Sequence, residues 1–409
     1  MNIWLLRASE PMPVVDPDGR LMRMGMIAEE LSNRGHNVIW FSSTFNHFTK
    51  KQSYDKDTIV KVKDNYHLYL SHANSYKKNI SVSRILNQRT IAKKFKKQAK
   101  KLDRPDLIYA SFPTIEYAEA AVKYGKKHNI LVIVDIRDLW PDIFKHNLKG
   151  LMRIAAMPYI KLMNYKAKKI MKNAFAINAN SEAVLSWGLN KGSRNKTEYD
   201  RYFYIGYNKP KISETFKHNA EIDKSKFNIL FLATINNQFN YKLIAELAKK
   251  LEKEDKDINI YICGDGPQME ILKNLVEGIS NVKLLGWIGK SEIDYMLKNS
   301  QVGLAPYKDT FDFQMGVSNK FAEYISYELP IILTSGGYMK SLLEKNDCGI
   351  SSQNIDEICK YVLELKNNET RYDEVSKNAK DLYEENFVAD KIYKNLADYL
   401  ENIIGGIKQ

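Results

Sequence analysis

Short apolar segments alternate with longer amphipathic ones along most of the chain. In the second half, Phe227 to Ala233 and Ile258 to Cys263 are apolar segments of strand length, and Tyr241 to Lys253 between them has helical periodicity. Alternation of this kind is typical of α/β proteins, in which helices cover both faces of a parallel sheet. The pattern therefore predicts a doubly wound parallel sheet.

The first half of the chain begins with the same pattern. Asn2 to Leu6 and Asn37 to Phe41 are strand-like, and Arg20 to Arg34 between them has the periodicity of an amphipathic helix. These three segments predict a βαβ unit. Further strands are expected at residues 58–62, 66–70, 107–110, 130–136 and 176–179, and helices at residues 82–102 and 115–128.

The length of the chain predicts two domains. A chain of 409 residues with 44% hydrophobic content is long enough for two separate cores. Gly206 to Asn228 is polar, contains Pro210 and lacks periodicity, so it is the expected linker. We therefore expect an N-terminal domain at residues 1–207 and a C-terminal domain that begins at residue 208.

Composition limits the possible classes of protein. Cys263, Cys348 and Cys359 form no C-x-x-C pair, which favours the reducing cytoplasm. The first residues resemble a strand rather than a signal peptide, and no apolar run reaches the roughly 18 residues that would span a membrane. A net charge of +13 suits phosphorylated substrates or an anionic membrane surface, whereas the absence of a nucleic-acid motif argues against nucleic acid.

The segment from Gly303 to Ile332 contains the clearest candidate site. It joins an apolar strand, a polar loop and an amphipathic helix that Ser318 is placed to cap. The N–H groups at a helix N-terminus attract anions, and Lys320 in the first turn adds a positive charge. Glu323, one turn further on, is placed to accept hydrogen bonds from hydroxyls such as those of a ribose. The alternative is an ordinary surface helix with an acid in its first turn.

The sequence SNKFAEY, followed by ELPII, resembles the donor-binding segment of glycosyltransferase family 4, the retaining GT-B enzymes. It is most similar to the bacterial capsule and O-antigen subgroup, which includes N-acetyl-L-fucosamine transferases. The resemblance implies two Rossmann-like domains facing across a cleft, with a C-terminal helix at residues 386–409 crossing back to the first domain. The second domain would then span residues 208–385.

The same resemblance assigns roles and shows one departure. The family has two glutamates eight residues apart, the second on the ribose and the first near the donor sugar. Glu323 matches the second, whereas Met315 stands at the first position. How the sugar hydroxyls are held is therefore open.

The motif DIRDLWPD, Asp135 to Asp142, follows a predicted strand and resembles the same subgroup. Carboxyl ends of parallel strands are where open α/β folds place ligands. Many relatives have a histidine bordering the donor sugar where this chain has Arg137. Asp138 is a second candidate for a catalytic role, and the alternative is that it is an ordinary loop carboxylate or helix cap. The alternative role for Trp140 is to anchor the hydrophobic core.

Two further loops resemble segments that contact the nucleotide base through backbone groups. They are GDGP and LGWIG, and they supply Gly264, Asp265, Gly266, Trp287 and Ile288. GDGP alone is a common turn, here expected to place Pro267 in the first turn of a helix. Many relatives also grip the diphosphate with an arginine and a lysine after the strand at 227–233. Here Asn236 and Asn237 supply no charge, so Lys320 would carry most of the neutralisation.

The sequence DPDGR near the N-terminus stands where relatives have a glycine-rich loop close to the donor phosphate and acceptor. Asp18, Gly19 and Arg20 are therefore candidates for that loop. A turn glycine is the alternative explanation for Gly19.

Residues 149–175 are rich in Met, Leu, Ile and Lys, and Pro158 is expected to divide them into two helices. A broad apolar face on a basic background fits either packing on its own domain or a monotopic membrane contact. In the second case the inserted residues would be Met152, Ile154, Ile160 and Met163, and the lysines facing anionic lipid would be Lys161, Lys166, Lys168 and Lys169.

Together, the residues and the resemblance predict a GT-B glycosyltransferase. It would move a sugar from a nucleotide diphosphate, a UDP-activated N-acetylated or deoxy sugar, to a lipid-linked saccharide, with no cofactor or metal and no nucleic acid, at the inner face of the cell membrane. The alternatives are a UDP-N-acetylglucosamine 2-epimerase-like isomerase on the same fold and a non-catalytic scaffold. The candidate catalytic residues are Lys320, Asp138 and Arg137, and the candidate donor-binding residues are Glu323, Ser318, Asn319, Gly316, Asn236, Asn237, Gly264, Asp265, Gly266, Trp287 and Ile288.

Overall fold

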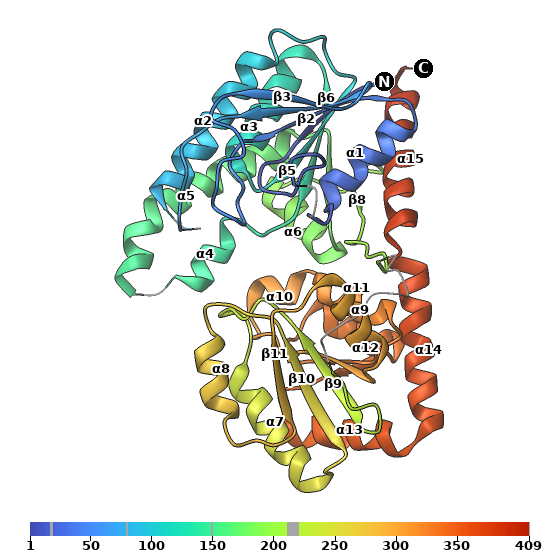
Figure 1. The fold of residues 1–409 in the computed structure, drawn as a ribbon. Helices are drawn as coiled ribbons and strands as arrows, with labels where there is room; N and C mark the ends of the chain where they lie inside the picture. The colour runs from blue at the N-terminus through green and yellow to red at the C-terminus, as the bar shows by residue number, and fades with distance from the viewer. Residues whose placement is uncertain (17–18, 79–80, 149, 211–220, 409) are drawn as a thin grey trace. The chain divides into compact units, whose positions relative to one another are not determined.

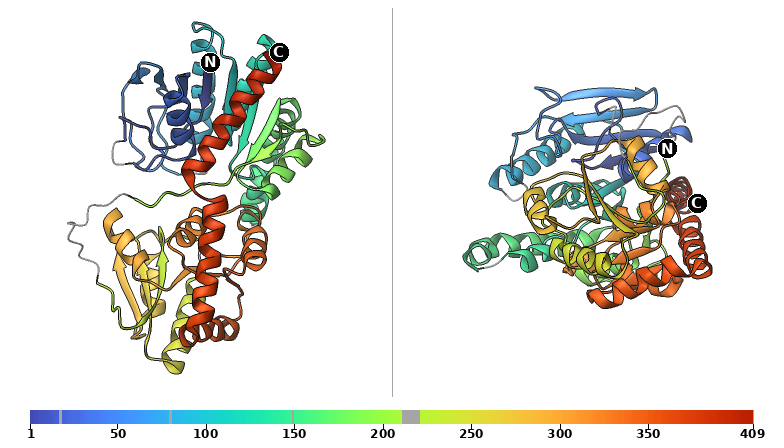
Figure 2. Two further views of the ribbon diagram at one scale, coloured as in Figure 1. Left: turned by 90° about the vertical axis from the view of Figure 1, so that its right-hand side faces the viewer. Right: turned by 60° about the horizontal axis from the view of Figure 1, so that its bottom comes forward.

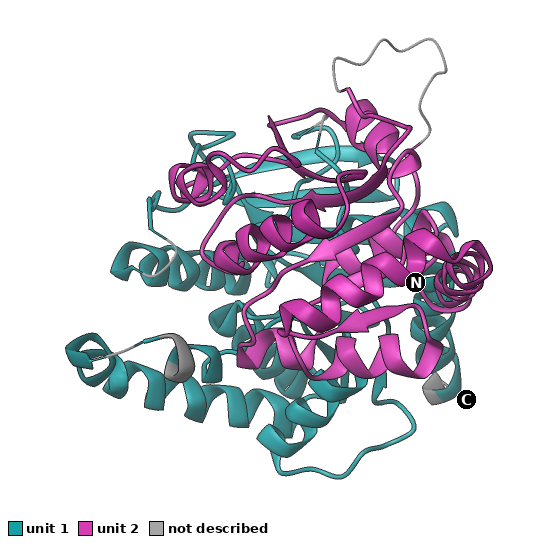
Figure 3. Ribbon diagram, turned by 90° about the horizontal axis from the view of Figure 1, so that it is seen from below, with its two compact units in different colours: residues 1–204, 391–409 teal, residues 205–390 magenta. Residues whose placement is uncertain are grey.

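Two compact units make up the chain in the computed structural model, which describes residues 1–16, 19–78, 81–148, 150–210 and 221–408 (Figures 1 and 3). Unit 1 comprises residues 1–204 and 391–409, and unit 2 comprises residues 205–390. The domain boundaries predicted from the sequence lie after residues 207 and 385. Each unit contains one sheet with helices packed against it.

The sheet of unit 1 has eight strands in the order β3-β4-β2-β1-β5-β6-β7-β8. All neighbouring strands are parallel except β3 and β4, so the prediction of a wholly parallel sheet is wrong at this edge. Asp64 and Asn65 alone connect β3 to β4, and so short a connection joins antiparallel strands only. The strands are β1 (Asn2–Leu6), β2 (Asn37–Ser43), β3 (Thr58–Lys63), β4 (Tyr66–Ser71), β5 (Leu107–Phe112), β6 (Leu131–Ile136), β7 (Ala176–Ala179) and β8 (Arg201–Tyr202).

The core of unit 1 is built on aromatic side chains. Trp4, Trp40, Phe41 and Phe95 are fully buried. Phe41 meets Trp4 edge to face at 5.2 Å between ring centroids and Phe95 at 5.0 Å, an arrangement that aromatic quadrupoles favour. The helices of this unit are α1 (Arg23–Asn33), α2 (Val82–Gln98), α3 (Ile115–His128), α4 (Asp142–Asn147), α5 (Gly150–Asn173), α6 (Glu182–Gly192) and, from Lys391 onward, α15 (Ala389–Lys408).

Helix α5 is continuous through Pro158, so the prediction of two helices here is wrong. A proline removes one N–H and displaces the carbonyl four residues earlier, here that of Ile154. Both Pro158 and Ile154 lie on the exposed side of α5, where water is available to the displaced carbonyl. The helix therefore tolerates the proline.

The most exposed apolar side chains of α5 lie in its first turns, which extend away from the rest of unit 1, and Leu162 and Tyr165 are exposed further along the helix (Figures 1 and 2). Leu151, Met152 and Ile154 are 83%, 69% and 69% exposed, whereas Ile160 and Met163 are buried. The prediction that Ile160 and Met163 belong to an exposed apolar face is therefore wrong, because they pack into unit 1.

Of the four lysines assigned to the same face, one also differs from the prediction. Lys166 forms an ion pair with Glu119 at 2.8 Å, so it is directed towards α3. Lys161, Lys168 and Lys169 are exposed as expected. None of the described helices combines the length and the apolar composition needed to cross a membrane.

The sheet of unit 2 has six parallel strands in the order β11-β10-β9-β12-β13-β14. Its strands are β9 (Phe227–Leu232), β10 (Ile258–Cys263), β11 (Val282–Gly286), β12 (Val302–Ala305), β13 (Ile331–Leu333) and β14 (Gly349–Ser351). The chain runs outward in one direction from β9 and in the other from β12. The carboxyl ends of these two neighbouring strands are therefore the topological switch point, where open α/β sheets bind ligands.

The helices of unit 2 are α7 (Tyr241–Glu254), α8 (Met269–Val276), α9 (Lys290–Lys298), α10 (Phe311–Met315), α11 (Asn319–Ser326), α12 (Tyr338–Asn346), α13 (Ile355–Asn367) and α14 (Glu369–Asn386). The short α10 lies in the segment expected to be a loop. Helix α8 begins at Met269, so the expectation of Pro267 in its first turn is wrong.

Candidate functional site

The loops that follow β9 and β12 lie side by side at the switch point of unit 2. Phe239 and Tyr307 form an antiparallel bridge, and the N–H of Asn240 donates to the carbonyl oxygen of Pro306 at 2.8 Å. These two loops and the N-terminus of α11 all follow the carboxyl ends of the central strands. They are therefore the elements on which a ligand site in this unit would be built.

Helix α11 is held against these strands by Tyr324. Its hydroxyl donates to the carbonyl oxygen of Leu304 on β12 at 3.2 Å and accepts from the N–H of Leu232 on β9 at 3.0 Å. A side chain on Gly303 would approach the Tyr324 ring to 2.4 Å, so only glycine allows this contact. The position of α11 is thus fixed relative to both central strands.

Ser318 caps α11 as the sequence predicts. Its Oγ accepts a hydrogen bond from the N–H of Phe321 at 3.2 Å, and its backbone is extended. The remaining N–H groups of the first turn have no acceptor within the helix and carry its positive dipole end. Gly316 ends α10, and Asn319 is exposed as the first residue of α11, so both lie beside this cap.

The side chain of Lys320 turns towards the strands. Its ammonium group donates to the carbonyl oxygen of Leu232, the last residue of β9, and lies 5.7 and 5.5 Å from the ring centroids of Phe231 and Phe239. Burial lowers the pKa of Lys320 to about 8, and the carboxylate of Glu323 partly opposes this shift. A cation with little water around it is therefore placed at the switch point.

Tyr307 is a further candidate site residue, which the sequence analysis did not name. Burial raises its pKa to about 12; the hydroxyl of Ser318 lowers the pKa through a hydrogen bond, and the charge of Glu323 raises it. The Tyr307 ring stacks on Phe313 of α10 at 4.2 Å. The only local signal for Tyr307 in the sequence is its position two residues after the apolar strand β12. Glu323 itself is partly exposed, as a hydrogen-bond acceptor for a ligand must be.

The glycines of the GDGP loop have a structural role. A Cβ on Gly264 would lie 1.7 Å from the carbonyl oxygen of Ala233, and one on Gly266 would lie 2.4 Å from that of Ile235. Both residues allow this loop to pack closely against the loop after β9. A side chain at either position would therefore separate the two loops.

Three residues assigned to base recognition differ in their exposure. Trp287 is 78% exposed and Asp265 is exposed, whereas Ile288 is buried. The Oδ1 of Asp265 accepts from the N–H of Gly266 at 2.7 Å, so this carboxylate stabilises its own loop. The exposed Trp287 ring is free to stack on a planar group.

A second cation, Lys308, lies beside the two asparagines of the loop after β9. The Nζ of Lys308 donates to both the carbonyl oxygen and the Oδ1 of Asn237 at 2.7 Å. Asn236 uses its Oδ1 to accept from the N–H of Gln238 at 3.0 Å and so shapes the loop. Lys308 thus places a further positive charge beside Asn237 from the loop after β12, and the expectation that Lys320 carries most of the neutralisation stays a prediction.

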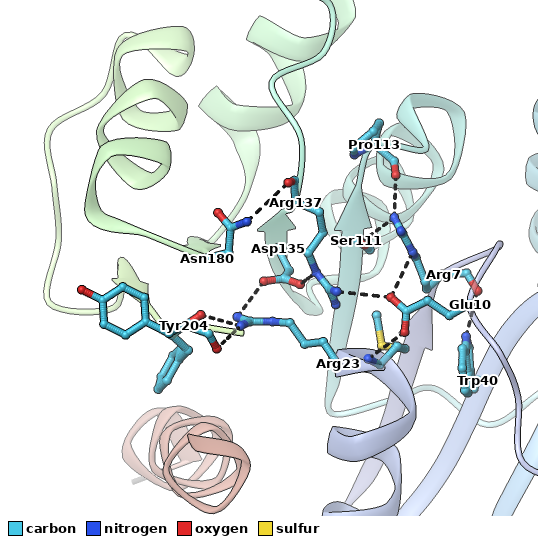
Figure 4. A network of polar contacts seen from close by, with 12 residues as sticks. Arg7, Glu10, Arg23, Trp40, Ser111, Pro113, Asp135, Arg137, Asn180 and Tyr204 are labelled. Atoms are coloured by element: carbon cyan, nitrogen blue, oxygen red, sulfur yellow. Dashed lines mark hydrogen bonds and ion pairs between the residues drawn. The ribbon is translucent and has the colours of Figure 1, made fainter. Parts of the chain in front are cut away.

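In unit 1, the motif DIRDLWPD contributes to a buried network of ion pairs (Figure 4). Asp135 pairs with Arg23 at 3.0 Å and also with Arg137, whose Nη1 reaches Glu10 at 3.2 Å. Burial acts to raise the pKa of Asp135, but Arg137 and Arg23 outweigh it and hold the pKa below its usual value. Glu10 also accepts from the N–H of Met24 at 2.9 Å.

Arg137 is directed into this network, and its side chain is only 10% exposed. Its Nη2 is buried without a hydrogen-bond partner in the described part of the chain. Asp138, by contrast, is exposed. The structure thus gives the two candidates different settings, and the catalytic role of each stays a prediction.

The neighbouring loops of unit 1 are described only in part. Asp18 lies outside the described residues. Gly19 closes a turn with its N–H on the carbonyl oxygen of Asp16 at 2.9 Å, which agrees with the turn-glycine interpretation, and Arg20 is exposed. No group of three or more His, Cys, Asp or Glu residues placed to hold a metal ion occurs in the described ranges.

Comparison with known proteins gives a family domain and a fold. Residues 226–368 match the family model described as Glycosyl transferases group 1. Over 172 residues the chain is 23% identical to the alpha-monoglucosyldiacylglycerol synthase of Acholeplasma laidlawii, and the match spans 41% of each protein. The chain thus covers less than half the length of this curated relative.

Solved structures match nearly the whole chain. The sucrose-phosphate synthase of Thermosynechococcus elongatus has a TM-score of 0.71 at 11% identity, with 99% of both chains covered. Anabaena HepE in complex with UDP-glucose has a TM-score of 0.64 at 13% identity, covering 98% of this chain and 100% of the other. WaaG, a glycosyltransferase involved in lipopolysaccharide biosynthesis, has a TM-score of 0.59 at 12% identity, covering 99% and 100%.

These matches define the class of protein. The fold is GT-B, as predicted, and each of the two α/β units contains one sheet. Unit 2 carries a glycosyltransferase domain of group 1, and its matched residues include β9, β12, α11 and the loops between them.

Proposed function

We propose that the protein is a retaining glycosyltransferase that moves a sugar from a UDP-activated donor to a hydroxyl of a lipid-linked saccharide. The observation that carries the proposal is Lys320, a cation of low hydration at the carboxyl end of β9 and in the first turn of α11. Lys308 adds a second positive charge at the same edge of the sheet. UDP is the favoured nucleotide because the structurally similar HepE is described in complexes with UDP and UDP-glucose.

The reaction breaks the bond between the anomeric carbon and the diphosphate and forms one to the acceptor oxygen. Negative charge develops on the departing diphosphate. Preorganised cations and N–H dipoles stabilise such charge strongly, because they require no reorganisation during the step. In this proposal Lys320 and the N-terminus of α11 fulfil that role, and the leaving phosphate accepts the proton of the acceptor hydroxyl. Glu323 would accept hydrogen bonds from the ribose.

The choice of acceptor rests on two similarities and on α5. The synthase that matches part of the chain glucosylates a lipid by its name, and WaaG is described as acting in lipopolysaccharide biosynthesis. Exposed Leu151, Met152 and Ile154 at the tip of α5 supply the apolar surface that peripheral membrane binding requires. We therefore place the protein at the membrane surface, in the capsule and O-antigen group whose N-acetyl-L-fucosamine transferases SNKFAEY and RDLWP resemble.

A UDP-release assay with UDP-activated sugars, with and without lipid-linked saccharides, tests the proposal. A transferase releases UDP in stoichiometric amounts with the glycosylated lipid, and release depends on the acceptor. An epimerase interconverts the nucleotide sugar without any acceptor. Epimerisation also needs acids and a base around the sugar ring. Interconversion of the donor in the absence of acceptor would contradict the proposal.

A further inference from the structure

A cavity opens at the amino ends of β9, β10 and β11 in unit 2, whereas Lys320 lies at the carboxyl end of β9. Its volume is about 510 Å³, within the range of about 300–1,000 Å³ that small-molecule sites occupy. The segment before β9, the end of α7, strand β10 and the start of β11 form its wall. The cavity is therefore separate from the candidate site at the switch point.

Strand β10 presents two polar side chains to this cavity, Asn259 and Tyr261, which are only 3% and 4% exposed. They are two residues apart, so they lie on the same face of the strand. The opposite face consists of Ile258, Ile260 and Ile262, all fully buried. The strand thus places polar groups at a depth where such groups need hydrogen-bond partners.

The hydrogen bonds of these two side chains are incomplete. The Tyr261 hydroxyl accepts from the N–H of Asp223 at 2.9 Å, which holds the segment before β9. Within the part of the chain that the structure describes, the O–H of Tyr261 has no acceptor and the amide of Asn259 makes no hydrogen bond. Anchoring the segment before β9 accounts for Tyr261 as an acceptor, but it does not account for Asn259.

Two further asparagines at the strand starts show what a structural amide does here. Asn228 is the register partner of Asn259 on β9, and its Nδ2 donates to the carbonyl oxygen of Asp223 at 2.8 Å. Asn281, directly before β11, donates from Nδ2 to the carbonyl oxygen of Ala248 at 3.1 Å. Both amides tie a strand to a neighbouring segment. Asn259 makes no such bond, so its amide is available to a molecule in the cavity.

Charges of both signs surround these two side chains. Three lysines and two acids line the cavity, so the charges nearly balance and favour neither a strong anion nor a cation. Glu252 accepts from the N–H of Ser280 at 2.8 Å, and the Nζ groups of Lys226 and Lys283 donate to the carbonyl oxygens of Lys256 and Ser280, both at 2.9 Å. The charged groups therefore shape the rim through local contacts.

We propose that this cavity binds a neutral saccharide unit, whose hydroxyls form hydrogen bonds with the amide of Asn259 and the O–H of Tyr261. A hydroxyl both donates and accepts, and it therefore matches an amide that offers one of each. The lysines and acids of the rim supply further donors and acceptors for neighbouring hydroxyls. The inference goes beyond the proposed function, because it concerns a second saccharide site that takes no part in the transfer.

Ligand-observed NMR titration of the full chain with maltose, in the presence of saturating UDP, tests this site. Asn259→Val removes the amide, and Tyr261→Phe independently removes the O–H. The matched control is Asn274→Val, which removes an exposed amide from α8. We expect maltose to bind about three- to tenfold more weakly to each site variant, the loss for one or two neutral hydrogen bonds, and unchanged to the control.

Hydrogen exchange of the wild type locates the bound sugar. Maltose should slow exchange in residues 223–226 and 280–283, which contribute to the cavity wall. Protection confined to unit 1 or to α11 would overturn the inference, because maltose would then occupy another site. Tighter binding of glucose 6-phosphate than of maltose would also overturn it, since the cavity would then select an anion.

Urea unfolding without ligand separates a binding role for Asn259 from a structural one. Asn259→Val should unfold at the same or a higher urea concentration than the wild type, because a strand-forming side chain replaces a buried amide without a partner. A lower midpoint together with unchanged maltose binding would overturn the inference, as would an equal loss of maltose binding in the control. Lys320→Ala should bind maltose normally. Absence of UDP release with every donor and acceptor, while maltose still binds, would count against the proposed function alone.

Discussion

Arg23 and Asp135 form an ion pair of 3.0 Å whose side chains are 1% and 0% exposed. The same guanidinium group donates to the carbonyl oxygens of Phe203 and Tyr204 at 2.5 and 3.2 Å (Figure 4). Arg23, on α1, is thereby linked to β6 and to Phe203 and Tyr204, which end the segment 1–204 of unit 1. The pair is a structural anchor beside the candidate residue Arg137.

Replacing Asp135 by Asn should destabilise unit 1 strongly. The change leaves Arg23 and Arg137 buried with less countercharge, and breaking one partner of a buried pair costs about 3–5 kcal/mol. Urea unfolding followed by circular dichroism measures this loss. Glu246→Gln, which removes an exposed partner of Lys242 on α7, is the control and should leave the unfolding midpoint nearly unchanged. Equal midpoints for Asp135→Asn and wild type would show that the pair is not an anchor.

Lys320→Ala should lower kcat by about a hundredfold, because a cation placed to stabilise charge in the transition state is lost. Steady-state UDP release with a donor that supports wild-type turnover measures the effect. Lys290→Ala, which removes an exposed lysine from the start of α9, should have near wild-type activity. Near-normal kcat in Lys320→Ala would refute the role assigned to this residue.

The pH dependence of turnover provides a separate prediction about Lys320. With a pKa lowered to about 8 by burial, the amine is protonated below that pH and neutral above it. The value of kcat/KM should therefore fall as pH rises through about 8, since the neutral amine cannot stabilise the diphosphate. The residual activity of Lys320→Ala should lack this decline. A decline of the same size in that variant would mean that another group titrates.

Local features of α11 could be predicted from the sequence, whereas its surroundings could not. Ser318 caps the helix because capping depends on residues three positions away. The contact between Lys308 and Asn237 joins residues 71 positions apart, and Arg23 pairs with Asp135 across 112 positions. No periodicity encodes such pairs. Pro158 was misread because its effect depends on which side of α5 faces water, and this is known only once the helix is packed.

Glu323→Gln should raise the KM for the donor about tenfold and leave kcat nearly unchanged. A ribose contact is remote from the bond that breaks, so its loss is felt as weaker binding in both ground and transition states. Initial rates at varied donor concentration measure both constants. Glu344→Gln, an exposed change on α12, is the control. A fall in kcat at constant KM would place Glu323 near the reacting atoms instead of the ribose.

The tip of α5 should bind anionic membranes reversibly. Leu151, Met152 and Ile154 supply the apolar surface, and Lys161 and Lys168 are exposed on the same helix. Each cation near an anionic surface contributes about 1 kcal/mol, and shallow insertion of apolar side chains adds to it. Neither contribution alone gives stable binding, so association should require anionic lipid and weaken with salt.

Flotation with liposomes measures this association. The wild type should float with anionic vesicles at low salt and remain in solution with neutral ones. Replacing Leu151, Met152 and Ile154 by Gln should abolish flotation, as should replacing Lys161, Lys168 and Lys169 by Glu. The control replaces Ile59, Leu86 and Ile271, which are also at least half exposed, by Gln and should float normally. Flotation with neutral vesicles, or an equal loss of flotation in the control, would contradict the prediction. General surface hydrophobicity would then explain the binding, and the tip of α5 would have another role.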